Sequence, residues 1–306
     1  MHAHTPFVGL VPAVLSPFDA AGELNLAAVE PHAALLVGDG VVGAFVGGTT
    51  GEFSSLTVDE RVALAGRWAA VLKGTPLRVV VHVGGNCLSD AKRLAAHAQS
   101  IGAAAIAAVA PSYFKPKSLE VLIAWCAELA AAAPGVPFYF YDIPVLTGVS
   151  FPMADFLDQA PARVPTLAGV KFTNPDLMTF QRLLRADRGR FDVLFGMDEQ
   201  LLAAVVLGAR GAVGSGYNFA APLFNRLLAA ARANDFATAR VEQYRGVELV
   251  ALMLRYGYLP AAKELMRVRG VDLGPLRLPH AALTVEQAAA LRGDLATTGL
   301  IDTIGR

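Results

Sequence analysis

Eight short apolar segments recur along the chain, and this repetition limits the folds that it can adopt. They occupy residues 9–15, 43–46, 77–83, 104–108, 138–141, 167–171, 192–196 and 211–215. Each is continuous rather than alternating in hydrophobicity, which is typical of parallel strands buried on both faces. Segments with helical periodicity lie between them at a spacing of about 30 residues, so the pattern predicts an α/β fold, the (β/α)8 TIM barrel. The alternative is a doubly wound open sheet, which normally carries a GxGxxG turn after its first strand. Val11-Pro12-Ala13-Val14 stands there instead.

Capping residues mark several of the predicted helices. Thr57 and Glu60 have the spacing of a capping box. Ser89 and Ser118 stand at two further helix starts as N-cap residues, and Asp198 begins a helix predicted at 199–206.

The strand pattern stops after about residue 221. Residues 222–233, 237–256 and 260–268 have the periodicity of amphipathic helices. We therefore expect a catalytic barrel domain over residues 1–221 and a C-terminal helical extension over residues 222–306 that packs on it.

Composition and charge exclude several functions. Lys plus Arg and Asp plus Glu each number 26, so the net charge is zero and no basic excess favours nucleic acid or an acidic membrane. Apolar residues make up 54%, but no charge-free apolar run reaches the roughly 18 residues that a membrane span needs. Residues 7–15 lack a preceding Lys or Arg and are interpreted as a buried strand rather than a signal peptide. The two cysteines, Cys87 and Cys126, form no close pair, which favours a reduced, cytoplasmic setting.

The sequence offers no metal-binding pattern. The six histidines are scattered, and no GxxxxGK, HExxH or EF-hand loop occurs. His82 lies near the end of the third predicted strand, where a lone histidine is more often a hydrogen-bonded core residue than a ligand.

Lys171 is the most informative candidate for chemistry, because active sites of such barrels lie at the C-terminal ends of the strands. It ends the apolar strand at 167–171, where a lysine packs poorly. Burial disfavours the ammonium form, and a neutral amine can attack a ketone to form a Schiff base. The alternative is a lysine that extends to water at the barrel mouth, and the strand pattern alone leaves both open.

Other strand ends supply further candidates. Tyr141 ends the neighbouring strand and could move a proton, although tyrosines of aromatic strands are usually core residues. The loop at 47–51 combines glycines with Thr49 and Thr50 and suits a carboxylate or phosphate. Asp198, Glu199 and Ser215 could bind sugar hydroxyls, although the first two carboxylates also suit a helix N-terminus.

These motifs, in this order, resemble the dihydrodipicolinate synthase / N-acetylneuraminate lyase family. The resemblance extends from about residue 9 into the C-terminal helices. It rests on Gly48-Thr49-Thr50-Gly51-Glu52, Tyr141-Asp142-Ile143-Pro144, Gly169-Val170-Lys171 and Gly214-Ser215.

The resemblance implies a class I aldolase that forms a Schiff base with pyruvate and uses no metal or other cofactor. Lys171 is then the Schiff-base lysine and Tyr141 the proton-transfer residue, while Thr49 and Thr50 hold the pyruvate carboxylate. Such enzymes are usually homotetramers. The polyol of a sugar acid is then expected to face Thr173, Gly196, Asp198, Glu199 and Ser215, and Tyr113 matches a position from which a neighbouring subunit contributes.

Leu146 favours the sialic acid lyase branch, since the synthases carry an arginine two residues after the proline of the tyrosine motif. This implies cleavage of N-acetylneuraminate to N-acetylmannosamine and pyruvate. Gly216 and Asp142 depart from the lyase pattern, which usually has Thr and Asn or His there. A dihydrodipicolinate synthase, another 2-keto-3-deoxy sugar acid aldolase or dehydratase, and a non-catalytic sugar-acid binding protein are the alternatives.

Overall fold

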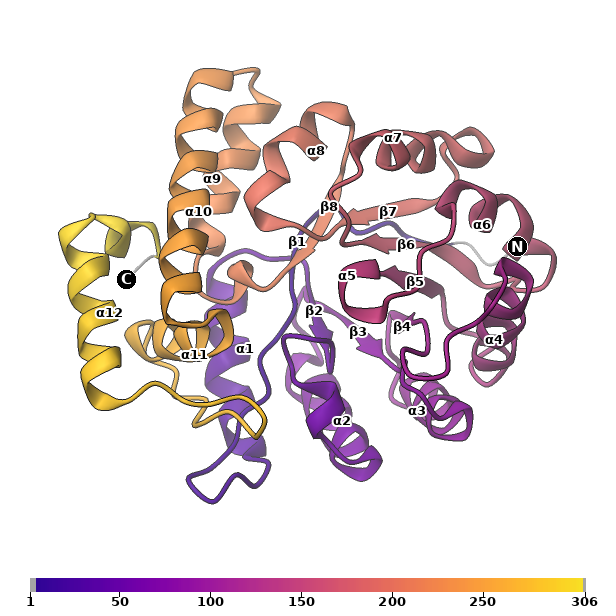
Figure 1. The fold of residues 1–306 in the computed structure, drawn as a ribbon, viewed down its shortest axis with the longest axis horizontal. Helices are drawn as coiled ribbons and strands as arrows, with labels where there is room; N and C mark the ends of the chain where they lie inside the picture. Colours follow the sequence, from indigo (N-terminus) through magenta and orange to yellow (C-terminus); the bar gives the residue numbers. More distant parts are fainter. Residues whose placement is uncertain (1–3, 305–306) are drawn as a thin grey trace.

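The computed structural model describes residues 4–304, and within them eight parallel strands form a barrel (Figure 1). The strands are β1 (Gly9–Pro12), β2 (Gly43–Val46), β3 (Arg78–His82), β4 (Ala105–Val109), β5 (Phe138–Asp142), β6 (Leu167–Phe172), β7 (Asp192–Phe195) and β8 (Gly211–Gly214). Strand β1 closes the barrel. It pairs with β8 on one side, and on its other side it meets the start of β2, where the Val42 amide donates to the Leu10 carbonyl at 2.9 Å. The predicted (β/α)8 barrel is thereby confirmed, and the open sheet is excluded.

Helices surround the barrel (Figure 1). They are α1 (Val29–Gly38), α2 (Val58–Leu72), α3 (Leu88–Ser100), α4 (Leu119–Ala131), α6 (Met153–Gln159), α7 (Leu177–Arg185), α8 (Leu201–Leu207) and α9 (Ala221–Arg232), with the short α5 (Pro144–Thr147) after β5. Short 3-10 helices lie at Leu26–Ala28, Phe53–Ser55, Ala160–Ala162, Ala186–Gly189, Asp198–Gln200, Gly216–Asn218 and Leu300–Thr303.

The predicted helix starts are partly correct. Thr57 and Glu60 form the capping box of α2, and Ser118 caps α4. The N-cap prediction for Ser89 is wrong, because the first turn of α3 already closes where the Ala91 amide donates to the Cys87 carbonyl. Asp198 opens a 3-10 turn and not α8, because its carboxylate accepts a hydrogen bond from the Gly216 amide instead of capping a helix.

Three further helices lie beside the barrel, namely α10 (Phe236–Tyr256), α11 (Tyr258–Val268) and α12 (Val285–Thr297) (Figure 1). The first two match the predicted segments, whereas α12 was not predicted, although Thr284 and Gln287 form a capping box at its start. Helix α9 contacts β1 and α8 as well as α10. The boundary at residue 221, which assigns almost all of α9 to the extension, stays a prediction. None of the helices within residues 4–304 has the length and apolarity to span a membrane.

The strands are buried on both faces, which explains their continuous apolar sequences. One core fills the space between sheet and helices, and a second fills the barrel interior with small residues and aromatic rings, among them Ala105, Ala107, Phe45 and Tyr141. The barrel is therefore a packed scaffold with its side chains fixed, which lets the strand ends hold functional groups in place.

Candidate active site

Lys171 and Tyr141 are neighbours at the C-terminal ends of β6 and β5. The parallel register pairs the two residues directly, and the Lys171 Nζ lies 3.7 Å from the centre of the Tyr141 ring. The same Nζ lies 4.5 Å from the centre of the Phe45 ring. Only 4% of Lys171 is exposed, and within residues 4–304 it forms no ion pair. The amine therefore sits on aromatic faces at the barrel mouth and is not neutralised by a carboxylate.

The threonine loop, residues 47–52, lies above β2 against this pair. Gly47 has a φ of +66°, which favours glycine and turns the chain out of the strand. The Thr49 Oγ1 lies 3.4 Å from the Tyr141 hydroxyl oxygen. Gly51 is packed so closely that a Cβ there would stand 2.9 Å from the Val14 carbonyl oxygen, and Ser16 Oγ donates to the Gly51 carbonyl at 2.6 Å. The loop is thus fixed where it presents its hydroxyls.

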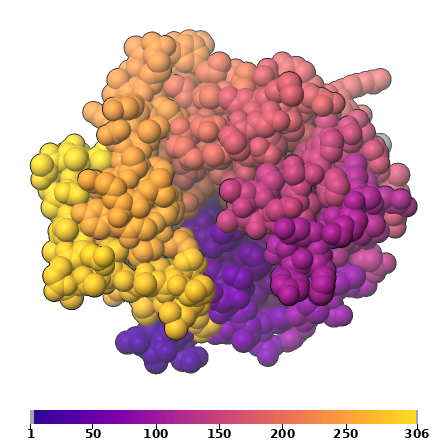
Figure 2. All heavy atoms as spheres, viewed as in Figure 1, coloured from indigo at the N-terminus to yellow at the C-terminus, as the bar shows by residue number. Residues whose placement is uncertain are grey.

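A cavity of about 230 Å³ opens at this end of the barrel. Its lining includes seven residues singled out from the sequence, which are Thr49, Thr50, Tyr141, Lys171, Thr173, Gly196 and Ser215. The space-filling view shows the molecule hollowed near its centre, with indigo atoms from the start of the chain at the bottom of the hollow (Figure 2). The structure therefore gathers the candidates from five different strand ends in one cavity.

Thr173 and Gly196 contribute to this cavity as a pair. A Cβ on Gly196 would lie 2.0 Å from Thr173 Oγ1, so glycine is what makes room for the threonine. That hydroxyl is buried, and it has no hydrogen-bond partner within the described part of the chain. It is free to bind a polar group of a ligand.

Four predicted residues do not line the cavity. Leu146 on α5 and Tyr113 in the loop after β4 are exposed by 59% and 79%. Asp198 and Glu199 follow β7 at the same end of the barrel, but neither belongs to the cavity lining.

The Asp198 carboxylate packs against the loop that follows β8. Its Oδ2 accepts a hydrogen bond from the Gly216 amide at 2.7 Å. A Cβ on Gly214 would meet Asp198 Oδ1 at 1.6 Å, and one on Gly216 would meet Oδ2 at 2.8 Å, so these glycines accommodate the carboxylate. Burial, with the nearby charge of Glu199, raises the pKa of Asp198 to about 7. Asp142 also has a pKa raised by burial, to about 6, and accepts a hydrogen bond from Asn174.

Tyr258 and Leu259, which no sequence pattern indicated, also line the cavity from the start of α11. Ser215 Oγ donates a 2.8 Å hydrogen bond to the Tyr258 hydroxyl oxygen. Burial raises the pKa of Tyr258. Inspection of strand ends cannot find these residues, because they come from the helical extension.

A buried ion pair supports the threonine loop from the same helix. Glu52, at a φ of +53°, accepts a hydrogen bond from the Arg277 amide at 3.0 Å, and its Oε1 lies 3.9 Å from Lys263 Nζ. Lys263 also donates to the carbonyls of Ser16, Leu273 and Pro275, at 2.8, 3.1 and 2.6 Å. The extension thus contacts both the wall of the cavity and the back of its loop.

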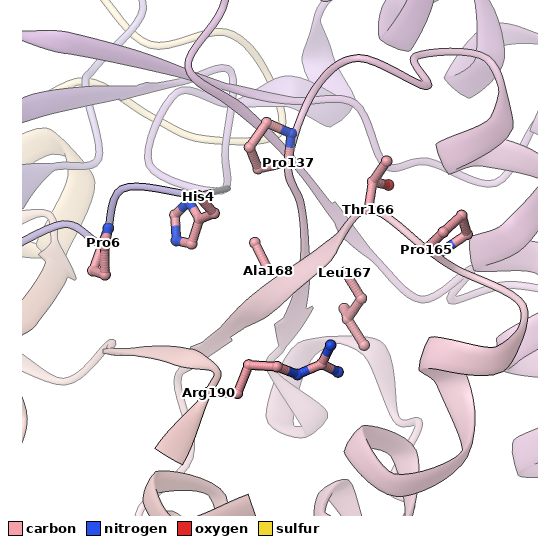
Figure 3. A pocket seen from close by; sticks show the side chains of 8 residues that line it. All are labelled: His4, Pro6, Pro137, Pro165, Thr166, Leu167, Ala168 and Arg190. Carbon is pink, nitrogen blue, oxygen red and sulfur yellow. The ribbon is translucent and has the colours of Figure 1, made fainter. Parts of the chain in front are cut away.

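A second cavity, of about 220 Å³, lies at the opposite end of the barrel, where β6 starts. Figure 3 shows the side chains that line it. His4, Thr166 and Arg190 are its polar side chains, and residues at the start of β6 form part of its wall. None of the residues singled out from the sequence lines it. Among residues 4–304, no group of three or more His, Cys, Asp or Glu side chains is arranged to hold a metal ion.

Comparisons with known proteins agree with this geometry. The model of the dihydrodipicolinate synthetase family matches residues 6–298. N-acetylneuraminate lyase A of Xenopus laevis is 42% identical over 89% of this chain and 90% of its own length. The N-acetylneuraminate lyase of Rattus norvegicus is 39% identical over 97% of this chain and 94% of its own. The structure of Proteus mirabilis N-acetylneuraminate lyase superposes with a TM-score of 0.94 at 35% identity, over 97% of this chain and all of the other.

Proposed function

Since the chain belongs to the dihydrodipicolinate synthetase family, we propose that it is a lyase that cleaves N-acetylneuraminate to N-acetylmannosamine and pyruvate. The observation that carries the chemistry is the pairing of Lys171 with Tyr141, 3.7 Å from Nζ to ring centre, beside a loop of threonine hydroxyls. The names of the relatives carry the choice of substrate. No cofactor is needed, because the lysine itself supplies the electrophilic intermediate.

In the first step, the neutral Lys171 amine attacks the C2 ketone of the open-chain sugar acid. Tyr141 gives its phenolic proton to the hydroxyl group that leaves as water, and the iminium ion that remains withdraws electrons from the C3–C4 bond. Thr49 and Thr50 hold the neighbouring carboxylate, so that the attack is effectively intramolecular.

The Tyr141 phenolate formed in that step then takes the proton from the C4 hydroxyl as the C3–C4 bond breaks. The electron pair of that bond forms the pyruvate enamine, and the C4 oxygen becomes the aldehyde of N-acetylmannosamine. Tyr141 gives this proton to C3. Water then hydrolyses the resulting iminium ion to pyruvate and the free lysine amine, and the proton released returns to the Tyr141 oxygen. The 3.4 Å approach of Thr49 to the Tyr141 hydroxyl supports this assignment, since it links the proton carrier to the carboxylate loop.

The other end of the substrate is assigned to Thr173, Gly196 and Ser215, with Asp198 and Glu199 just beyond the cavity lining. We propose that Leu146 stands at the rim in place of an arginine that a dicarboxylic substrate needs. This end of the cavity differs from the lyase pattern, because Gly216 stands where the lyases usually have threonine, and Asp198 packs on it. A related 2-keto-3-deoxy sugar acid is therefore the alternative substrate.

We also propose a homotetramer located in the cytoplasm, in which Tyr113 contributes to the site of a neighbouring subunit. Support comes from the exposed apolar side chains of Tyr113, Phe114, Val145 and Leu146 in the loops after β4 and β5. The two cysteines are free thiols, as expected of a reducing compartment. Sedimentation of the protein and of a Phe114→Asp variant tests the assembly, which the substitution is expected to weaken.

Borohydride trapping tests the proposed function. We expect that reduction in the presence of N-acetylneuraminate leaves a pyruvyl adduct on Lys171, identified by peptide mass spectrometry, and that Lys171→Ala shows neither adduct nor turnover. Lys263 is an internal control, because its amine is engaged by three carbonyls. An adduct with pyruvate alone would move the search to other sugar acids. No adduct with either compound would contradict an aldolase and favour a binding protein.

A further inference from the structure

His82 is a buried polar residue beneath the active site that the mechanism above does not use. It ends β3 and is 1% exposed. Its ring meets the Tyr141 ring edge-on at 6.0 Å between centres and the Phe53 ring at 4.6 Å. It therefore lies in the layer of side chains that supports the Lys171–Tyr141 pair.

The hydrogen bonds of His82 define its tautomer. Nδ1 lies 2.8 Å from the Gly47 carbonyl oxygen, which can only accept, so Nδ1 carries the proton. Arg61 Nη2 is 3.4 Å from Nδ1 but 2.9 Å from the His82 carbonyl oxygen, and it donates to the latter. Nε2 is buried without a hydrogen-bond partner among residues 4–304.

A second proton on His82 is disfavoured, because Nε2 has no acceptor and the surroundings are positively charged. Burial, together with the charges of Arg61 and Lys171, holds the pKa of His82 well below its ordinary value. The neutral ring, which donates one hydrogen bond and adds no charge beside Lys171, is therefore the favoured form of His82.

The carbonyl that accepts this bond starts the threonine loop. Gly47 has a left-handed backbone, and the next residue, Gly48, passes so close to Phe45 that a Cβ would lie 2.7 Å from its ring. The direction of the chain from Gly47 decides where Thr49 and Thr50 stand, two and three residues later. A displacement of about 1 Å at such a group can lower a rate about a hundredfold.

We propose that His82 is a positioning residue of this active site, which fixes the threonine loop relative to Tyr141 and Lys171 through its Nδ1–H bond to the Gly47 carbonyl. This inference rests on the proposed aldolase function and deepens it. It assigns a role in the reaction to a histidine whose sequence context indicated only a core residue.

Two substitutions separate the hydrogen bond from the packing of the ring. The amide nitrogen of His82→Asn stands where Nδ1 was and can still donate to Gly47, whereas that of His82→Gln reaches the place of Nε2. We expect His82→Asn to keep kcat/KM within about threefold and His82→Gln to lose about ten- to a hundredfold. Most of the loss is expected in KM for N-acetylneuraminate and in the pyruvate concentration that gives half-maximal borohydride trapping, because the loop binds the carboxylate.

A matched control compares His97→Gln, which keeps a donor at the place of Nε2, with His97→Leu, which removes it. His97 makes a comparable 3.0 Å bond to the Val62 carbonyl, but on α3 outside the barrel, so thermal unfolding should change without a change in KM. Equal activities of His82→Asn and His82→Gln, or losses that merely follow their melting temperatures, would overturn the inference.

The same experiment distinguishes this inference from the function on which it rests. If the wild type traps pyruvate but does not cleave N-acetylneuraminate, the proposed substrate is wrong, and trapping by the two His82 variants still decides the role of the histidine. If the wild type forms no adduct at all, there is no Schiff-base site to position, and both proposals fall.

Discussion

Replacing Lys263 with methionine should destabilise the protein by about 3–5 kcal/mol, the usual cost of removing one partner from a buried ion pair. Methionine preserves most of the buried volume, so the loss is electrostatic. Three backbone carbonyls lose their donor, and Glu52 loses the cation 3.9 Å away. Burial already raises the pKa of Glu52, and the charge of Lys263 opposes that rise, so the substitution raises it further.

The sign of the pH dependence follows from this pKa. Without Lys263 the folded protein favours the protonated Glu52, whereas the unfolded chain ionises it near pH 4.3. Holding that carboxyl protonated at pH 7 costs at most about 1.36 × (7 − 4.3), or roughly 3.7 kcal/mol. The cost falls as the pH is lowered, so Lys263→Met should regain part of its lost stability at pH 5.

Denaturant unfolding of Lys263→Met, Glu52→Gln and the double variant at pH 7 and pH 5 measures these quantities. The Glu52→Gln side chain retains an acceptor for the Arg277 amide and needs no counter-charge, so the double variant should lose about 1–3 kcal/mol less than the sum of the single variants. Lys92→Met is the control, because its ion pair with Glu128 is exposed and is worth less than about 1 kcal/mol. A Lys263→Met penalty below about 1 kcal/mol, or one that is the same at both pH values, would refute the reasoning.

Three further predictions concern the site itself. Lys171→Met should abolish turnover. The free energy of unfolding should stay unchanged or rise by about 1 kcal/mol, because the buried amine has no ion-pair partner within residues 4–304. A clear loss of stability in denaturant would contradict this. The pKa of Asp198 is about 7 in the folded protein and near 4 in the unfolded chain, so the free energy of unfolding of the wild type should fall as the pH is raised from about 4 to about 7. Asp198→Asn cannot ionise, so denaturant unfolding at several pH values should give a flatter profile for this variant. Gly216→Thr must displace the Asp198 carboxylate, because the threonine Cβ would stand 2.8 Å from Asp198 Oδ2. The variant should lose about 1–3 kcal/mol of stability and show an altered KM for the sugar acid. Unchanged stability and KM would count against this contact.

The barrel and its reactive pair could be predicted because both follow from local pattern. Continuous apolar strands identify the fold, and adjacent parallel strands bring their last residues together, as they do for Tyr141 and Lys171. The orientation of Asp198 could not be predicted in this way. It depends on the space left by two glycines of β8 and its following loop, which is a property of the packed structure and not of the carboxylate's own sequence.

Helix α11 is the element whose role in the site was least accessible to sequence analysis, because its important residues are defined by what they touch. Tyr258 accepts a hydrogen bond from Ser215 at the cavity wall. Lys263, five residues later on the same helix, holds the carbonyl of Ser16, whose side chain in turn donates to Gly51 of the threonine loop. A barrel without this helix would leave Ser215 without that partner and Glu52 buried without Lys263. The functional unit therefore extends beyond the eight strands and their helices, and the polar contacts of α11 join the extension to the chemistry.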